Sequence, residues 1–308
     1  MKHQLSHNPR NPSVITIGTF DGVHIGHQKI IDRLVKTGKE KKLKSIVLTF
    51  FPHPRMVIQP DFEIKLLHTI EERQEMLKTF GLDHLVIKEF TTDFANLSAH
   101  DYVKQILIEE LNVKHIIIGY DHHFGKNRTA NIDDLKFFGN VFDFTVEEIS
   151  AQDIEDVAVS STKIRHALLE GDIEKANSFL GYPYLLTGNV IKGKGIGKTI
   201  SFPTANIEIE QPYKLIPKNG VYVVKSVIEK QTVYGMMNIG TNPTFENKKQ
   251  SIEVHFFNLD KQLYGSKLKI ELLKRLRDEQ KFESVEHLVN QLNIDKENSI
   301  AFLSTNNA

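Results

Sequence analysis

The chain has 308 residues, and this length exceeds what one hydrophobic core usually organises, so two domains are expected. Its 39 Lys and Arg balance its 39 Asp and Glu, which leaves no overall field to attract nucleic acid or anionic lipid and favours a small-molecule substrate. The absence of cysteine excludes disulfides, thiolate catalysis and Cys-ligated zinc or iron–sulfur sites.

The first half of the chain alternates predicted strands with predicted helices. No segment has the character of a signal peptide or of a membrane span, so a cytoplasmic protein without a membrane partner is expected. A strand–helix alternation favours a parallel sheet with helices on both faces. The predicted strands span residues 13–20, 44–51, 83–90, 114–120 and 142–149, and the predicted helices span residues 26–42, 69–81 and 98–112, the second with a capping box at Thr69 and Glu72 and the third with Ser98 as its cap.

The pattern changes near Gly181, after two short predicted helices at residues 161–171 and 172–181. Alternating strands and turns then dominate, and their spacing predicts an antiparallel sheet or a small barrel closed by a final helix. We therefore place the domain boundary near Tyr182, with one domain at 1–182 and the other at 183–308. The predicted strands here span residues 184–191, 220–230, 231–239, 251–258 and 266–276, and the final helix spans 284–295.

Two histidines, His24 and His27, stand among glycines directly after the first predicted strand. At such a junction the amides and the dipole of the following helix favour an anion, and Gly18, Gly22 and Gly26 allow a phosphate to approach the backbone. Two imidazoles three residues apart share one side of a helical turn and can both donate to phosphate oxygens. The stretch resembles the H-x-G-H signature of nucleotidyltransferases, which attack the α-phosphate of ATP.

Three further segments of the first half suit a nucleotide. Ser161, Thr162 and Arg165 begin a predicted helix and suit a triphosphate, although plain helix capping explains the hydroxyls equally well. The segment "GYDHHFG" at 119–125 suits an adenine or phosphate pocket, and its adjacent histidines are not expected to form a metal site by themselves. His53 follows the second strand and is either a binding residue or a turn residue.

In the second half, "GKGIGKTISFPTAN" at 193–206 resembles a phosphate-binding P-loop. One position is missing before its Lys-Thr pair, and Pro203 stands where a helix should begin, so a P-loop is not expected. A glycine-rich flap is predicted instead, whose amides and Lys194 or Lys198 hold phosphates.

The next segments suggest a metal ligand pair and a base. Thr204 and Asn206 share one side of an extended chain and offer hard oxygen ligands for Mg²⁺, with a simple turn after Pro203 as the alternative. Glu253 shares a strand face with His255 and is suited to accept a proton from a hydroxyl nucleophile. A solvated strand face is the alternative for Glu253.

Together these segments resemble the bacterial bifunctional riboflavin kinase/FMN adenylyltransferases, from about residue 13 to about residue 295. The resemblance rests on "GTFDGVHIGHQ", "FFPHPR", "GYDHHFG" and "SSTKIR" in the first half. In the second half it rests on "GKGIGKTISFPTANI", "KNGVYVV", "NIGTNPTF", "SIEVHFFN", "LYG" and "LRDEQKF". It implies a Rossmann-like α/β nucleotidyltransferase domain followed by a mostly antiparallel β-barrel riboflavin kinase domain with a C-terminal helix.

The resemblance implies two reactions: phosphorylation of riboflavin to FMN with ATP and Mg²⁺, then adenylylation of FMN to FAD with a second ATP. Glu253 would be the base of the first reaction, and His24 and His27 would stabilise the α-phosphate in the second. The implied ATP and phosphate contacts are Gly18, Phe20, Asp21, Gly22, His53, Asp121, Ser161, Thr162, Arg165, Gly193, Lys194, Gly195, Lys198 and Asn206; the flavin contacts are Arg277, Glu279 and Phe282; and the Mg²⁺ ligands are Thr204 and Asn206.

The chain departs from the family pattern at His122 and His123, and at Lys198, which keeps the charge of the usual arginine but loses bidentate phosphate contact. Two other functions share parts of the pattern: a nucleotidyltransferase whose barrel binds RNA, as in a tRNA-charging enzyme, and a non-catalytic flavin carrier. The balanced charge disfavours the first, and two phosphate sites disfavour the second. The expected partners are riboflavin, FMN and ATP, without nucleic acid, in a monomer or weak homo-oligomer.

Overall fold

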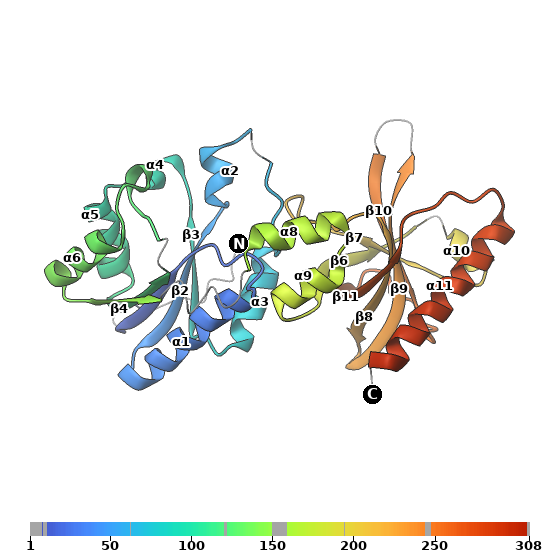
Figure 1. The fold of residues 1–308 in the computed structure, drawn as a ribbon, viewed down its shortest axis with the longest axis horizontal. Helices are drawn as coiled ribbons and strands as arrows, with labels where there is room; N and C mark the ends of the chain where they lie inside the picture. The colour runs from blue at the N-terminus through green and yellow to red at the C-terminus, as the bar shows by residue number, and fades with distance from the viewer. Residues whose placement is uncertain are drawn as a thin grey trace. The chain divides into compact units, whose positions relative to one another are not determined.

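The computed structural model describes residues 8, 11–61, 63–119, 122–149, 159–193, 195–243 and 248–306. The chain forms two compact units, Met1–Ser161 and Thr162–Ala308 (Figure 1). Helix α9 (Ile173–Leu180) packs on strands of the second unit, so by compactness it belongs there. The domain boundary predicted near Tyr182 from the change in the sequence pattern stays a prediction.

The first unit is built on a five-stranded parallel sheet in the order β3-β2-β1-β4-β5. All five strands lie where the apolar runs predict them, which confirms the α/β prediction. The strands are β1 (Ser13–Ile17), β2 (Lys44–Phe51), β3 (His84–Glu89), β4 (Val113–Gly119) and β5 (Thr145–Ile149), and the helices are α1 (Ile25–Lys41), α2 (Pro54–Ile58), α3 (Ile70–Thr79), α4 (Thr92–Ala95), α5 (Ala99–Asp101), the π-helical η1 (Tyr102–Glu110), the 3₁₀ turn η2 (Lys126–Arg128) and α6 (Ile132–Phe142).

Two hydrophobic clusters cover the two faces of this sheet. Successive residues of each central strand point to opposite faces, so β1 sends Ile15 to one cluster and Val14 to the other. Helices η1 and α6 pack over the face that carries Ile15, and α1 and α3 pack over the face that carries Val14. Burial on both faces explains why these strands are nearly continuous apolar runs in the sequence.

The helix ends follow local hydrogen-bond signals. Thr69 and Glu72 form the predicted capping box of α3, and Ser98 caps the next helix as predicted. Helix α6 was not predicted, although Asn131 and Asp134 form a second capping box at its start. Leu135, Phe138 and Phe142 give this helix an apolar face that packs against the hydrophobic cluster.

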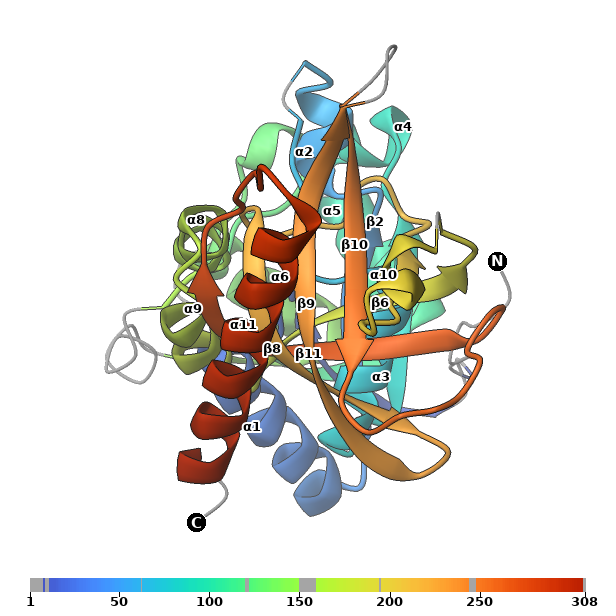
Figure 2. The same cartoon turned by 90° about the vertical axis from the view of Figure 1, so that its right-hand side faces the viewer.

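The second unit is a closed antiparallel barrel with strand order β10-β7-β6-β11-β8-β9. Figure 2 shows α11 along the outside of the strands, where it packs on β9 and β11. The elements are α8 (Ser161–Glu170), whose first residue belongs to the first unit, α9, β6 (Tyr184–Ile191), α10 (Ile196–Thr199), β7 (Ala205–Glu208), β8 (Gly220–Ile228), β9 (Gln231–Pro243), β10 (Lys248–Phe256), β11 (Lys267–Arg277) and α11 (Val285–Asn306).

The final helix differs from the prediction, because α11 continues well past residue 295 to Asn306. The polar residues that suggest a helix end include Asp295, which is only 1% exposed because Arg277 pairs with it. Ser299, one turn further on, is also buried. Asp295 therefore resembles a residue at a helix end in the sequence, although in the structure it lies in the middle of α11 and is buried by its ion pair with Arg277.

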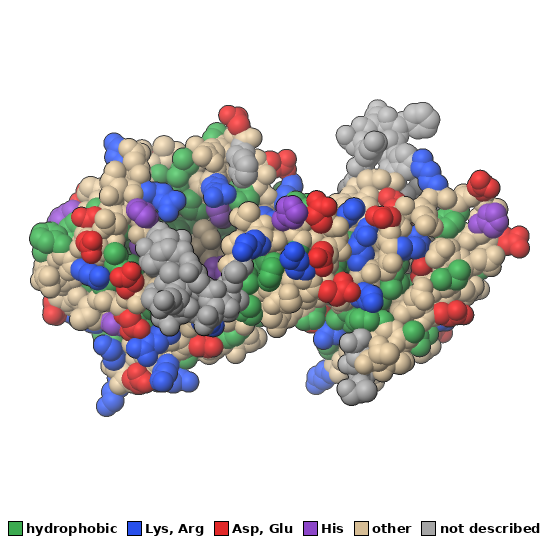
Figure 3. All heavy atoms as spheres, in the orientation of Figure 1, with side chains coloured by type: hydrophobic (Ala, Val, Ile, Leu, Met, Phe, Trp, Pro, Cys, Tyr) green, Lys and Arg blue, Asp and Glu red, His purple; other side chains and the backbone are tan. Residues whose placement is uncertain are grey.

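The surface carries both signs of charge. Figure 3 shows Lys and Arg side chains mixed with Asp and Glu side chains over the face in view, and the chain has 39 residues of each sign. Within the described ranges, no helix combines the length and apolar character that crossing a bilayer requires.

Candidate active sites

The loop of residues 18–24 leaves the carboxyl end of β1, the central strand of the parallel sheet. The chain proceeds from β1 to one side of the sheet and later returns to the other side through β4, so this end is a topological switch point, where α/β sheets bind ligands. The loop backbone is strained: φ is +47° at Phe20, +88° at Gly22 and +38° at Val23. The side chains of Phe20 and Val23 are buried in the hydrophobic core, and their packing holds the turn in its strained conformation.

His24 ends this loop as the N-cap of α1. Its Nδ1 accepts a hydrogen bond from the backbone N–H of His27 at 3.3 Å, so the proton of the neutral ring lies on Nε2. The two imidazoles stack with their centroids 3.6 Å apart and an interplanar angle of 16°. His24 therefore presents its Nε2–H, with the His27 ring stacked beside it, at the positive end of a 17-residue helix, which is a suitable place for an anion.

Burial keeps both imidazoles neutral. His24 is 7% exposed, and desolvation lowers its pKa to about 4, an effect that the Asp21 carboxylate partly offsets. Desolvation also lowers the pKa of His27, and the nearby His24, Arg73 and His68 lower it further. The Nδ1 atom of His27 is buried without a hydrogen-bond partner among the described residues. A buried polar atom of this kind is what a ligand site leaves open.

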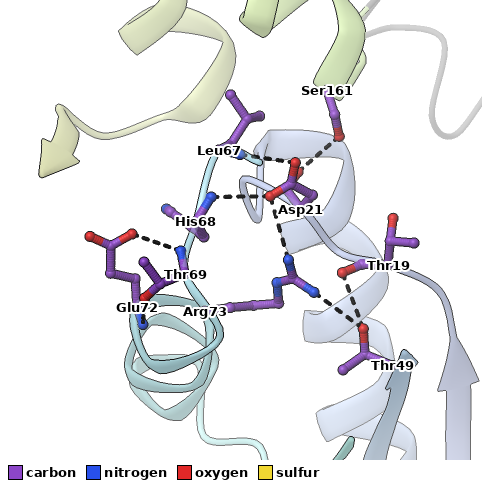
Figure 4. A network of polar contacts seen from close by, with 9 residues as sticks. All are labelled: Thr19, Asp21, Thr49, Leu67, His68, Thr69, Glu72, Arg73 and Ser161. Atoms are coloured by element: carbon purple, nitrogen blue, oxygen red, sulfur yellow. Dashed lines mark hydrogen bonds and ion pairs between the residues drawn. The ribbon is translucent and has the colours of Figure 1, made fainter. Parts of the chain in front are cut away.

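A buried polar network supports the loop (Figure 4). The carboxylate of Asp21 accepts hydrogen bonds from the backbone N–H groups of Leu67 at 3.0 Å and His68 at 3.1 Å, and Arg73 Nη2 lies 3.5 Å from it. The Ser161 hydroxyl donates to the Asp21 carbonyl oxygen at 2.8 Å. Asp21 is 0% exposed, so its carboxylate is directed into the protein, and the ATP contact predicted for it stays a prediction.

Several other predicted residues lie at the same edge of the sheet or outside the described part. His53 caps α2 directly after β2, which is the parallel neighbour of β1. His122 follows β4, the other neighbour, and its ring lies 6.0 Å from that of Phe124. Asp121 lies outside the described residues. Thr162 and Arg165 lie on α8 within the second compact unit, and their roles remain predictions.

In the barrel, strand register brings together the residues predicted for the kinase reaction. Glu253 of β10 pairs with Asn206 of β7 on one side and with Asn238 of β9 on the other. Thr204, just before β7, donates from its Oγ1 to Oε2 of Glu253 at 3.1 Å. Sequence analysis did not single out Asn238, for which a polar residue inside a predicted strand, after two methionines, was the available signal. The four side chains form one polar group on neighbouring strands.

The chemistry of this group suits a magnesium ion. Thr204 and Asn206, the metal ligands predicted from the sequence, supply hydroxyl and amide oxygens, which are hard ligands of the kind that Mg²⁺ prefers. The described residues contain no cluster of three or more His, Cys, Asp or Glu that could hold a metal ion. A Cβ at Gly193 would collide with the Asn206 amide, so the loop lies directly against this group.

The flap that holds Gly193 has no long helix of the kind that follows a P-loop. Only α10, of four residues, follows it, and Gly195 opens this turn with a φ of +73°. Lys198 is exposed, whereas Lys194 lies outside the described residues. Phe202 closes the turn by donating its backbone N–H to Gly197 at 2.8 Å. The glycine-rich flap predicted from the sequence is therefore present.

The predicted flavin residues lie at the connection between β11 and α11. The Arg277 guanidinium binds the Asp295 carboxylate through Nε at 2.9 Å and Nη2 at 2.7 Å. It also lies over the Phe282 ring, 5.8 Å from the centroid. Arg277 therefore joins the barrel to its final helix, and any flavin contact must use the remaining face of the side chain.

Glu279 connects this loop to the polar group formed by Thr204, Asn206, Asn238 and Glu253. Its Oε1 accepts the backbone N–H of Thr241 at 3.2 Å. A Cβ at Gly240 would collide with the Glu279 carboxylate and meet the Asn238 amide nitrogen at 3.0 Å. Glu279 and Asn238 thus flank one backbone position, which links the predicted flavin loop to the strand beside Glu253.

Comparison with known proteins identifies the family to which each half of the chain is similar. The FAD synthetase family model matches residues 6–163, and the riboflavin kinase model matches residues 180–303. The bifunctional riboflavin kinase/FMN adenylyltransferase of Bacillus subtilis (strain 168) is 38% identical over 98% of this chain and 96% of its own length. The chain belongs to this bifunctional family. The family member from Listeria monocytogenes is 39% identical over 94% of this chain and 92% of its own length. The family member from Escherichia coli K12 is 33% identical over 96% of this chain and 94% of its own length.

A solved structure from Streptococcus pneumoniae, described as a macrolide-efflux protein, has the same fold, with a TM-score of 0.85 and 33% identity over 96% of both chains. The bifunctional riboflavin kinase/FMN adenylyltransferase family carries the two domains in the order found here. The chain accordingly phosphorylates riboflavin to FMN and adenylylates FMN to FAD, with ATP as co-substrate of both reactions. The family resemblance read from the sequence is confirmed.

Proposed function

We propose that the stacked imidazoles of His24 and His27 stabilise the α-phosphate of ATP during adenylyl transfer to FMN. The observation that carries this proposal is the stacked, neutral pair at the helix N-terminus, with the His24 proton on Nε2. A phosphate oxygen of FMN attacks the α-phosphorus while the bond to pyrophosphate breaks. Negative charge grows on the non-bridging oxygens, and preorganised N–H donors stabilise it without further rearrangement.

We propose that Glu253 is the base of the kinase reaction. Its carboxylate takes the proton of the ribityl 5′-hydroxyl, whose oxygen attacks the γ-phosphorus as the bond to ADP breaks. Thr204 and Asn206 would hold Mg²⁺, which when bound neutralises charge on the phosphates. The Thr204–Glu253 hydrogen bond of 3.1 Å supports this arrangement, because it keeps the base beside the residues assigned to the metal.

The two reactions attack different phosphorus atoms with different leaving groups. Each needs its nucleophile in line with its own leaving group, and positioning supplies much of the rate. Separate nucleotide sites in the two units satisfy this requirement. We further infer a cytoplasmic enzyme, supplied with ATP there, that acts as a monomer or weak homo-oligomer.

The test is turnover of riboflavin with ATP, in magnesium buffer and in EDTA, with products separated by chromatography. FMN and then FAD are expected with magnesium, and EDTA is expected to abolish FMN formation. Pyrophosphate release should require FMN and should match FAD in amount. Formation of FMN at an unchanged rate in EDTA would contradict the magnesium assignment, and pyrophosphate release without FAD would contradict the proposed adenylyl transfer.

A further inference from the structure

Arg73 is a fully buried charged side chain that reaches the histidine loop from α3 (Figure 4). It is 1% exposed, and its guanidinium lies 3.5 Å from the Asp21 carboxylate and 3.4 Å from Thr49 Oγ1. Burying a charge is costly unless an opposite charge and hydrogen bonds compensate it. The compensating carboxylate belongs to the strained loop itself, three residues before His24, so this costly pair lies beside the proposed reaction site.

The same network fixes the loop backbone at two points. Asp21 accepts the backbone N–H groups of Leu67 and His68, and Thr49 donates to the carbonyl oxygen of Thr19 at 3.2 Å. The positive φ angles of the loop occur between and just after these points. Strained backbone persists only where surrounding contacts over-determine it, and these contacts do so here.

The Arg73–Asp21 ion pair also influences the pKa values of His24 and His27. The Arg73 guanidinium lowers the pKa of His27, as do His24 and His68, whereas the Asp21 carboxylate raises the pKa of His24. Without Arg73, His27 would lose one of the positive charges that lower its pKa, and the Asp21 carboxylate would act on His24 without the neighbouring guanidinium, so both protonated forms would be favoured. Protonation of His24 at Nδ1 would remove the acceptor of its 3.3 Å hydrogen bond to the His27 backbone. The bond that orients its Nε2–H would then be lost.

We propose that Arg73 is a positioning residue for adenylyl transfer: it neutralises Asp21 inside the protein, fixes the loop, and keeps both imidazoles uncharged and oriented as N–H donors. The inference rests on the proposed role of His24 and His27. Arg73 contacts neither FMN nor ATP in this scheme and acts through Asp21 and the histidine loop.

The test uses the full chain with four variants: Arg73→Met, Arg73→Lys, Asp21→Asn and the double variant Asp21→Asn/Arg73→Met. Histidine side-chain NMR measures the protonation midpoints of His24 and His27, and FAD formation from added FMN is followed between pH 5 and pH 8. Arg73→Met should raise the midpoints by about one pH unit or more. It should also lower FAD formation more at pH 5 than at pH 8, while Arg73→Lys should stay near the wild type.

The double variant separates charge from packing. Asp21→Asn should lower the midpoints, and combining it with Arg73→Met should bring them back toward the wild-type values, although both side chains are changed. Thr49→Val removes one contact of Arg73 without a change of charge and should leave the midpoints in place. FMN formation by the barrel reports folding of the second unit, and the NMR spectrum reports folding of the first.

Unchanged midpoints in Arg73→Met, with FAD formation reduced by one factor at every pH, would show a purely structural residue and overturn the inference. A Thr49→Val shift as large as that of Arg73→Met would do the same. If Arg73→Met does not fold, Asp21→Asn decides, since unchanged midpoints there also overturn it. Failure of the proposed function is a separate outcome, because His27→Ala would then leave FAD formation intact while the titrations still shift.

Discussion

Thr204 and Glu253 lie 49 positions apart in the chain, yet the Thr204 hydroxyl donates to Glu253 Oε2 at 3.1 Å. The pairing of Glu253 with Asn206 across β10 and β7 fixes this contact, because it aligns the two strands at that position. A proposed base and one proposed metal ligand, Asn206, are thus held on paired strands, with Thr204 directly before one of them, and strands position reacting groups more accurately than loops do.

Glu253→Gln should therefore reduce FMN formation by about 10²–10⁴, the usual contribution of general-base catalysis, since the amide keeps the shape but cannot take the proton. FAD formation from added FMN should be unchanged. Glu271→Gln is the matched control, because this carboxylate lies on β11 and pairs with Lys225 at 3.1 Å. Equal losses in both variants, or loss of FAD formation in Glu253→Gln, would contradict the assignment of Glu253.

His27→Ala should reduce FAD formation by about 10²–10³, the usual loss for one transition-state donor, while FMN formation continues. The loss should appear in kcat more than in KM, because the proposed donor acts on charge that develops in the transition state. His100→Ala, which removes an exposed histidine of the same unit, is the control. A folded His27→Ala protein with normal FAD formation would rule out this role.

Gly193→Ala tests the contact between the flap and the kinase group. The added methyl would collide with the Asn206 amide and displace it, so FMN formation should fall and the KM for MgATP should rise. Gly195→Ala is a control in the same flap, since its Cβ meets nothing within 4 Å and only its φ of +73° adds strain. Similar kinase constants for the two variants would show that Asn206 has no part in nucleotide binding.

The sequence predicted what local patterns encode. The sheet strands were found because burial on both faces makes them apolar runs, and the histidine pair was found because its spacing and glycines are local features. Arg73 was missed because it lies in a stretch of charged residues that reads as an exposed helix face. Its partner Asp21 is 52 positions away, and only the folded sheet brings them together. Asn238 was also missed, because its importance comes from its pairing with Glu253, which only the folded barrel brings about.

Asp295→Ala should destabilise the second unit by about 3 kcal/mol, because it leaves the Arg277 guanidinium without its buried partner. Hydrogen exchange along α11 should increase, and the midpoint of urea unfolding for the barrel should fall. Asp278→Ala removes an exposed carboxylate that pairs with Arg275, and its effect should be small because water screens such a pair. Unaltered exchange in α11 of Asp295→Ala would mean that the helix is held by its apolar contacts alone.

The low pKa of His24 predicts how the first unit responds to acid. Desolvation lowers this pKa from 6.5 to about 4, so between these values the unfolded chain binds a proton that the folded unit does not. Stability is therefore complete above about pH 6.5 and falls as the pH decreases, by about 3 kcal/mol at pH 4 from this group. His24→Gln should flatten this pH dependence. Because the chain has no tryptophan, hydrogen exchange of first-unit peptides is the suitable measurement. An identical pH slope in wild type and His24→Gln would show that His24 is not buried in its neutral form.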